Sequence, residues 1–585
     1  MRKMKSGVAA LTFVGLTDII NLYQNKCVDP GRVAQGASAQ RERAVGWEPV
    51  CRGLWEVRPE STLREGQYRS AAAAVTGFER QTEVEPRFGM KTAFVAVLRY
   101  SEEGFFVFAA SVCHTKGEVF MQIFNTLTRQ KEEFVPQVPG EYRIYVCGPT
   151  VYNYIHIGNA RPLIVFDTLR RYLEYRGNKV VYVSNITDID DKLIKKGQEE
   201  GTSMKEVAQR FEAEYLKDAA GLNCKKPTVQ PRATEHIQQI LDIVKDLIDS
   251  GHAYVAKNGD VYFRVKSDPE YGKLSHLKLD DLESGNRELR SQMEDDLKED
   301  PADFAVWKAA KPGEPAWESP YGMGRPGWHI ECSAMSRTHL GKTIDLHCGG
   351  QDLIFPHHEN EIAQSECANG CEFARYWMHN GFINVDNQKM SKSLHNFFTV
   401  RDVANLYGYE PIRYFMLTAG YRMPLNYTVD LIESCKNSLE RLYTCRENLD
   451  FALSKSEFGT DESLKAKADE ARTKFCKAMD DDLNTPDALA AVFDLVKEIN
   501  TLSASSTKEA LEAAAKAFDE ITDVLGLMYN RKKDEVPAEV TELVEKRAAA
   551  KKAKDWSTAD AIRAQLTEMG WAVKDTAQGP QLSKL

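Results

Sequence analysis

The sequence predicts an α/β protein in which a parallel sheet, interrupted by an insertion, precedes a helical bundle and a small C-terminal domain of mixed α/β structure. Three observations predict this. A strand, a helix and a second strand alternate between residues 142 and 183. The pattern is lost from about 254 to 325 and then resumes, and the chain beyond about 400 has helical apolar spacing. With 585 residues, the chain is too long for one core, so several domains are expected.

The overall composition is that of a soluble globular protein, with 43% hydrophobic and 28% charged residues. The net charge is −10, so any contact with nucleic acid has to come from local basic patches. No apolar run reaches the roughly 18 residues of a membrane helix, and no membrane contact is expected. The 12 cysteines are scattered, which favours reduced thiols and a cytoplasmic location.

The first 120 residues form an atypical N-terminal extension. They contain 16 basic and 13 acidic side chains, and arginine outnumbers lysine, unlike the later chain. The start, from Arg2 to Leu16, is similar to a signal peptide but lacks a good small-residue cleavage site. The 11 glutamates of this region argue against a transit peptide, which should be poor in acidic residues.

Met121 begins a strand-like segment and has the character of a natural start. The preceding Lys116-Gly-Glu118 is compatible with a purine-rich coding stretch that resembles a bacterial ribosome-binding site. We therefore hypothesise that Met121 is the initiator and that residues 1–120 are an upstream over-translation. The alternative is an appended disordered or accessory domain. The intact mass of the native protein separates the two, since a mass that includes residues 1–120 contradicts the hypothesis.

The first half of the predicted sheet is a β-α-β unit. Tyr142–Cys147 predicts a short buried strand that Gly148 and Pro149 end, Arg161–Tyr175 has helical apolar spacing, and Val180–Val183 is a β-branched strand. Such a unit implies a Rossmann-like parallel sheet covered by helices. Phosphate-binding groups belong at the carboxyl ends of its strands, where His156 and Thr187 fall.

The rest of the chain divides by pattern. Asn258-Gly259 between two apolar segments predicts a hairpin, and an acidic stretch rich in proline and glycine follows. The α/β pattern resumes at Gly327-Trp328 and includes Ile344–His347. Helices are expected at 431–453, 462–479 and 486–502, two shorter ones between 536 and 566, and a strand pair after Gly570. The expected domains are 121–253, 254–325, 326–398, 399–430, 431–532 and 533–585.

Two separated motifs carry groups suited to one triphosphate. Lys389-Met-Ser-Lys-Ser393 supplies mobile positive charge and hydroxyl donors. About 230 residues upstream, His156-Ile-Gly-Asn159 enters a helix, where the backbone can approach phosphates at the positive end of the helix dipole. A short loop of lysines and serines is by itself usually solvated. In this order and separation, the pair resembles the HIGH and KMSKS signatures of class I aminoacyl-tRNA synthetases.

A metal centre is the second candidate site. Pro356 can begin a helix on which His357 and Glu361, four residues apart, share a face and can hold one cation, with His358 as the rival ligand. The thiolates of Cys147 and Cys332 would complete a donor set of two sulfurs, one imidazole and one carboxylate, which suits zinc. Taken alone, these residues are also compatible with core thiols and a helix-surface pair.

Four segments, in order, resemble cysteinyl-tRNA synthetase, and with the helical region the resemblance covers about residues 121–585. They are Cys147-Gly-Pro-Thr-Val-Tyr152, Thr187-Asp-Ile-Asp-Asp-Lys192, Gly327–Met335 and Phe355–Glu361. The resemblance implies one zinc ion per chain, bound by Cys147, Cys332, His357 and Glu361. It also implies a cysteine pocket that Thr187 and Trp328 line beside the ligands Cys147 and His357, although Trp328 is also compatible with simple core packing.

The resemblance implies a cysteine–tRNA ligase that activates L-cysteine with ATP and transfers it to the 3′ end of tRNA(Cys). A pocket separates cysteine from serine poorly by size, whereas zinc prefers a thiolate to a hydroxyl. His156, Lys389 and Lys392 are the expected catalytic residues, with Mg²⁺ accompanying ATP. Asn159 departs from the histidine of the signature and can donate hydrogen bonds but carries no charge. The expected ATP-binding residues are His156, Gly158, Asn159, Lys389, Met390, Ser391, Lys392 and Ser393.

For the C-terminal half, the resemblance implies stem contact by 399–430, tRNA binding by the 431–532 bundle, anticodon binding by 533–585 and a monomeric enzyme. A basic run from Lys546 to Lys554, with Arg563, Trp571 and Lys574, suits phosphate contact and base stacking, although such runs are often only solvated helix faces. The alternative function is a stand-alone ligase that joins cysteine to an amino sugar, whose relatives lack a full C-terminal tail. A non-catalytic tRNA-binding protein is disfavoured by the intact Lys-Met-Ser-Lys-Ser motif.

Overall fold

The chain forms two compact units, residues 1–118 and 119–585, in a computed structural model. In the first unit, three antiparallel strands make a sheet with β3 in its centre. The structure describes residues 55–57, 93–100, 106–113, 121–277, 297–390, 396–455, 457–531, 537–576 and 579–584, so the signal-like start at Arg2–Leu16 lies outside it. The strands of the first unit are β1 (Trp55–Val57), β2 (Ala93–Tyr100) and β3 (Phe106–Cys113).

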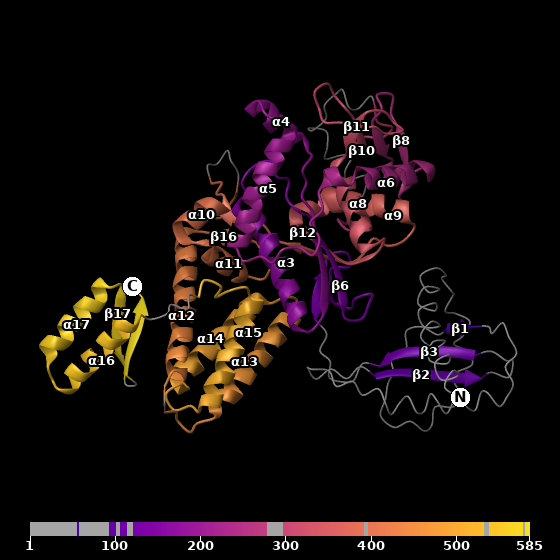
Figure 1. Ribbon diagram of the computed structural model, residues 1–585. Coiled ribbons are helices and arrows are strands. Elements are labelled where there is room, and N and C mark those ends of the chain that lie inside the picture. Colours follow the sequence, from indigo (N-terminus) through magenta and orange to yellow (C-terminus); the bar gives the residue numbers. More distant parts are fainter. Residues whose placement is uncertain are drawn as a thin grey trace, which may run out of the picture. The chain divides into compact units, whose positions relative to one another are not determined.

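A parallel four-stranded sheet is the centre of the second unit (Figure 1), in the order β13-β12-β6-β7. Because β6 leads outward to β7, and β12 leads outward to β13 on the other side, the strand order reverses between β6 and β12. In open α/β sheets, ligands bind at the carboxyl ends of the strands beside this point. The predicted α/β class with a parallel sheet is confirmed. The four strands are β6 (Glu141–Val146), β7 (Lys179–Ser184), β12 (Ile344–Gly350) and β13 (Ala374–Asn380).

Helices cover both faces of this sheet, as the alternation of β6 shows. Ile144 belongs to the core that includes helix α3 (Ile157–Tyr175), whereas its neighbour Tyr145 belongs to the core that includes helices α8 (Trp328–Leu340) and α9 (Glu359–Asn369). Successive side chains of a strand point to opposite faces, so α3 lies on one face and α8 with α9 on the other. Burial on both faces accounts for the continuous apolar character of these strands.

The insertion between β7 and β12 contains a second, antiparallel sheet in the order β11-β10-β9-β8. The predicted hairpin is present, and Gly259, with a φ of +91°, makes its turn. Helix α6 packs on this sheet around the fully buried Trp307. The elements of this region are α4 (Asp191–Glu200), α5 (Met204–Gly221), α6 (Ile237–Asp249), β8 (Ala253–Val255), β9 (Val261–Phe263), β10 (Phe304–Ala309) and β11 (Gly324–Pro326).

The chain after β13 is mainly helical, and the three long predicted helices lie within two residues of their expected bounds. Asn484 caps α14 by accepting a hydrogen bond from the Asp487 amide, as its position predicts. Helix α15 was not predicted individually. No helix of the described residues is long and apolar enough to span a membrane. The helices are α10 (Val400–Tyr407), α11 (Tyr409–Leu417), α12 (Val429–Leu453), α13 (Ser463–Asp480), α14 (Thr485–Leu502), α15 (Lys508–Val524), α16 (Ala538–Lys552) and α17 (Trp556–Glu568).

Three small strand groups complete the second unit. The predicted terminal strand pair is confirmed as β17 with β18. A mixed sheet in the order β15-β14-β16 follows β13 and contains Lys389 in its edge strand. The strands are β4 (Gln122–Asn125), β5 (Gln130–Glu133), β14 (Ile383–Val385), β15 (Gln388–Lys389), β16 (Leu425–Tyr427), β17 (Trp571–Thr576) and β18 (Gly579–Lys584).

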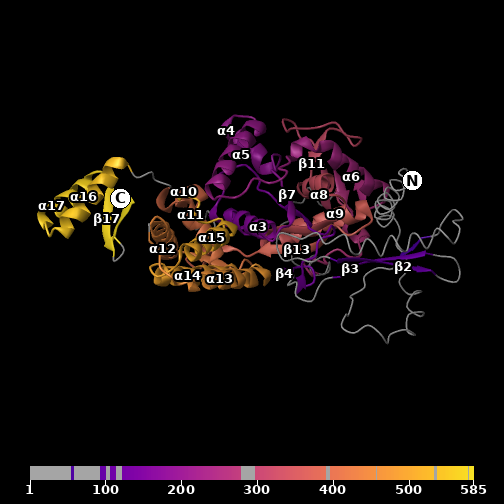
Figure 2. The same cartoon turned by 60° about the horizontal axis from the view of Figure 1, so that its bottom comes forward.

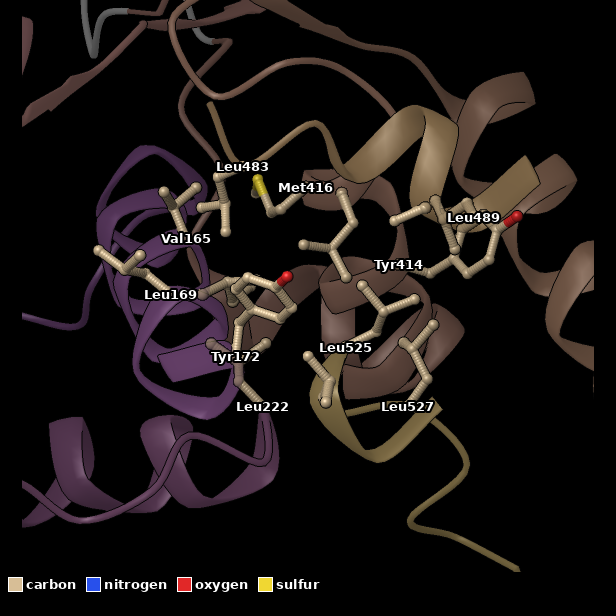
Figure 3. Close-up of a cluster of buried hydrophobic side chains, with 14 of the residues drawn as sticks. Val165, Leu169, Tyr172, Leu222, Tyr414, Met416, Leu483, Leu489, Leu525 and Leu527 are labelled. Carbon is tan, nitrogen blue, oxygen red and sulfur yellow. The ribbon is translucent and has the colours of Figure 1, made fainter. Parts of the chain in front are cut away.

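Helix α3 shares one hydrophobic core with the helical region. Both views of the chain place α3 beside α15 (Figure 2), and Val165, Leu169 and Tyr172 of α3 meet leucines from the ends of the bundle helices (Figure 3). Within this contact, the buried Asp167 accepts hydrogen bonds from Arg413 at 2.6 Å and Arg171 at 2.8 Å. Burial alone would raise the pKa of Asp167, but the two guanidinium groups hold it below its usual value. The helix is therefore fixed to the bundle by both apolar packing and ion pairs.

Candidate active site and metal centre

Cys147 directly follows β6 at the carboxyl edge of the sheet, and the next residue makes a very close backbone contact. A Cβ on Gly148 would lie 1.6 Å from the carbonyl oxygen of Asn185, so only glycine fits there. Its amide donates a hydrogen bond of 2.8 Å to Asn185 Oδ1, and Asn185 Nδ2 donates one of 3.1 Å to the Thr187 hydroxyl. The ends of β6 and β7 are therefore joined at the place where Cys147 and Thr187 emerge.

Four side chains from three separate segments converge beside this contact. Cys147 Sγ lies 3.8 Å from Cys332 Sγ of α8 and 3.4 Å from Glu361 Oε1 of α9. Glu361 Oε1 is 2.9 Å from His357 Nε2. The four donor atoms all lie within 4.8 Å of one another. Two thiols, one imidazole and one carboxylate in so small a volume form a donor set suited to zinc.

The helix geometry around His357 agrees with the prediction. Phe355 is extended, with φ −136° and ψ 132°, and the helical turn that leads into α9 follows it from Pro356. The extended residue is expected there, because proline disfavours the α-helical region for the residue before it. Residues 357–361 make one helical turn, so His357 and Glu361 share a face as expected.

The charges of this cluster are mutually dependent. The Cys147 thiol donates toward Cys332 and, despite burial, lowers the pKa of Cys332 to about 6. Burial would raise the pKa of Glu361, but His347 and His357 hold this pKa at about 2. Burial would lower the pKa of His357, but Glu361 and Cys332 raise that pKa to about 10. Burial raises the pKa of Cys147. These shifts favour negative charge on Cys332 and Glu361, and a divalent cation can neutralise such charge.

A row of buried imidazoles supports the cluster. His347 Nε2 lies 2.9 Å from the second oxygen of Glu361, and His329 Nδ1 lies 2.9 Å from His357 Nδ1. His358 Nδ1 lies 2.8 Å from His379 Nε2, and the other ring nitrogen of His379, Nδ1, lies 2.8 Å from the Thr126 hydroxyl. Cys147, His347, His358 and Glu361 also satisfy the distance condition for a metal, so two overlapping donor sets are possible. The sequence singled out neither His347 nor His379 as site residues, since a lone histidine on a strand is typical of a core.

The two expected cysteine-binding residues lie beside the cluster in different environments. Thr187 is buried, and its backbone is held by hydrogen bonds with Pro149 and Val151. Trp328 is 41% exposed and its ring centroid lies 4.4 Å from that of His357. Simple core packing therefore does not describe Trp328.

The two motifs that are predicted to bind phosphate approach each other through Met390 and Phe398. His156 precedes α3, and its amide donates to Asn159 Oδ1 at 3.1 Å, so the side chain that departs from the signature caps the helix. The Ile157 amide donates to the Phe398 carbonyl at 3.1 Å, which brings the segment after the lysine-rich motif against this turn. On the other side, a Cβ on Gly158 would lie 3.4 Å from Met390. Ser391, Lys392, Ser393 and the Lys389 side chain lie outside the described residues.

Comparison with known families places these features in context. Residues 133–437, more than half of the chain, match the class I (C) tRNA synthetase catalytic domain. Residues 474–530 match the DALR domain, and residues 533–581 match the cysteinyl-tRNA ligase anticodon binding domain.

Curated relatives agree over most of the chain. The cysteine–tRNA ligase of Caldicellulosiruptor saccharolyticus is 54% identical over 471 residues, that of Clostridioides difficile 53% over 473, and that of Lachnospira eligens 51% over 472. Each relative is covered completely, by 79–80% of this chain.

The parallel sheet with these motifs at its carboxyl edge, together with the catalytic-domain match, defines a class I aminoacyl-tRNA synthetase. Within that class, the identities of 51–54% and the C-terminal domain match show that the chain belongs to the cysteinyl-tRNA ligase family. It is therefore an aminoacyl-tRNA ligase, and a ligase for an amino sugar is not favoured.

Proposed function

We propose that this enzyme forms cysteinyl-adenylate from L-cysteine and ATP and then transfers the cysteinyl group to tRNA(Cys), with cysteine selected at the Cys147–Cys332–His357–Glu361 cluster. The main support for this proposal is the position of the cluster in the fold. It lies at the carboxyl edge of the sheet, directly after β6, and the same loop continues to the His156–Asn159 turn. An amino acid held at the cluster would have its carboxylate near a nucleotide held at the turn.

Zinc suits the cluster better than the overlapping set. Cys147, Cys332, His357 and Glu361 offer two sulfurs, and His347 is already engaged with Glu361 as a supporting group. A zinc ion there, one per chain, would supply a bond that a substrate thiolate forms and a serine hydroxyl does not. The remaining selectivity comes from protein groups: Trp328 offers an exposed ring against His357, and Thr187 offers a buried hydroxyl that accepts a hydrogen bond from Asn185.

The chemistry at phosphorus requires charge and position rather than a covalent intermediate on the protein. The cysteine carboxylate attacks the α-phosphate and pyrophosphate leaves. The terminal ribose hydroxyl of tRNA then attacks the adenylate carbonyl, and AMP leaves. His156 would donate to phosphate oxygens from the start of α3, and Lys389 and Lys392 would neutralise charge on the leaving pyrophosphate, with Mg²⁺ bound to ATP.

The C-terminal domain is the proposed anticodon reader, and the structure changes which residues are suited to it. The prediction that Trp571 stacks on a base is wrong, because Trp571 is buried in the core of this domain. Arg547 and Lys551 both pair with Asp575 and thereby join α16 to β17. Trp556, at 58% exposure, offers an open ring instead. The monomeric state remains a prediction from the resemblance.

The first test is cysteine-dependent exchange of pyrophosphate into ATP. We expect exchange with cysteine but not with serine. Lys392→Ala should reduce exchange by roughly 100-fold because one charge-stabilising group is removed, while cysteine binding is unchanged. Lys342→Ala is the matched control, since this exposed lysine precedes β12 at the opposite edge of the sheet. Unchanged exchange in Lys392→Ala would contradict its role, and equal exchange with serine would contradict selection at the cluster.

The second test decides between the two donor sets by zinc content after dialysis. Wild type should retain about one zinc per chain. Cys332→Ala and His357→Gln should lose it because each removes a ligand. His358→Gln should retain most of it, since that residue belongs only to the overlapping set. Cys367→Ala, on the far part of α9, controls for the loss of any cysteine. Loss of zinc in His358→Gln with retention in His357→Gln would reverse the assignment.

A further inference from the structure

Arg161 occupies an unusual position two residues after Asn159. It lies in the first turns of α3 and is completely buried. Its guanidinium donates two hydrogen bonds, from Nη1 to the Phe382 carbonyl at 2.9 Å and from Nη2 to the Gly420 carbonyl at 3.2 Å. Both acceptors lie more than 200 residues away in the sequence. A single side chain of the phosphate-binding helix therefore holds two distant loops.

The charge of Arg161 is not balanced as that of other buried arginines is. Arg171 and Arg413 both pair with Asp167, whereas no carboxylate among the described residues lies within ion-pair distance of Arg161. Burial lowers the pKa of Arg161 to about 10. The positive end of the α3 dipole also disfavours a cation in the first turns. Burying an unpaired cation costs folding free energy. A residue that carries this cost beside the His156–Asn159 turn indicates a role at that turn.

The two carbonyls belong to the base of the hairpin that contains Lys389. Phe382 connects β13 with β14, and Asn384 of β14 pairs with Lys389 of β15. Gly420 lies in the turn before β16, which pairs with β14 on its other side. The two loops are packed tightly, since a Cβ on Gly381 would lie 2.6 Å from the Arg422 carbonyl oxygen. Arg161 thus contacts the segments that lead into β14 and β16, and β15 pairs with β14.

We propose that Arg161 is a positioning residue that fixes the base of the Lys389 hairpin to the helix that begins at the His156–Asn159 turn. Its planar guanidinium reaches two carbonyls at once, which a lysine ammonium on a flexible stem does not do with the same rigidity. This side chain then fixes the separation between the two halves of the phosphate site together with the backbone hydrogen bond from Ile157 to Phe398. The inference rests on the proposed function of the hairpin lysines in adenylate formation.

The test measures adenylate formation in Arg161→Met and Arg161→Lys by pyrophosphate exchange with cysteine. Arg161→Met should lower kcat roughly 10- to 100-fold, because misplacement by about 1 Å can cost about 100-fold, and should leave the KM for cysteine unchanged. Arg161→Lys should recover part of the loss by restoring one hydrogen bond. The matched control is Arg170→Met on the same helix, whose guanidinium also donates to a loop carbonyl, that of Lys226. It should retain wild-type exchange.

Urea unfolding and zinc content accompany these assays. A loss of kcat in both variants with wild-type zinc content and an unfolding midpoint matching that of Arg170→Met supports positioning. Unchanged kcat in Arg161→Met, or losses that merely follow reduced stability, overturns it. If Arg161→Met does not fold, the Arg161→Lys variant decides by the same criteria. If the wild type exchanges pyrophosphate with cysteine and the Lys392→Ala variant does not, the proposed function stands even where this inference fails.

Discussion

The second unit depends on one constraint: four polar side chains from three distant segments have to share a small, largely buried volume. Placing Cys147, Cys332, His357 and Glu361 together away from water is unfavourable unless their charges balance one another or a bound cation balances them. The parallel sheet makes the arrangement possible, because its strand order reverses between β6 and β12 and opens a place for ligands at their carboxyl ends. The close approach of Gly148 to Asn185 then joins the ends of β6 and β7, and Asn185 donates a hydrogen bond to the Thr187 hydroxyl.

Helix α3 connects this constraint to the rest of the molecule. Its start holds the His156–Asn159 turn, its first turns hold the hairpin base through Arg161, and Asp167 with Tyr172 fixes its later turns to the bundle. Tyr172 donates a hydrogen bond of 2.6 Å to Asp480 at the end of α13. One helix therefore relates the proposed nucleotide site to the helices proposed to bind tRNA.

Local patterns predicted the elements that rest on local physics. The β-branched and helical periodicities gave β6, α3, β7 and the long helices, and the i, i+4 spacing gave the His357–Glu361 pair. Helix α15 was not predicted individually, although its apolar residues have helical spacing. Trp571 and Trp556 were not separable, since only packing against α16 and α17 decides which ring is buried. The sequence did not indicate a role for Arg161, because its partners lie more than 200 residues away. It did not indicate one for His347 either, because its partner Glu361 lies on another element. The expected domain bounds remain predictions.

X-ray absorption at the zinc edge is a direct test of substrate selection by this cluster, because it counts the atoms bound to the metal. In the zinc-loaded enzyme without substrate, we expect two sulfur neighbours at about 2.3 Å, from Cys147 and Cys332, with lighter atoms completing the set. Addition of L-cysteine should raise the sulfur count to three, and L-serine should leave it at two. A sulfur count that stays at two with cysteine would contradict selection of the substrate through its thiol.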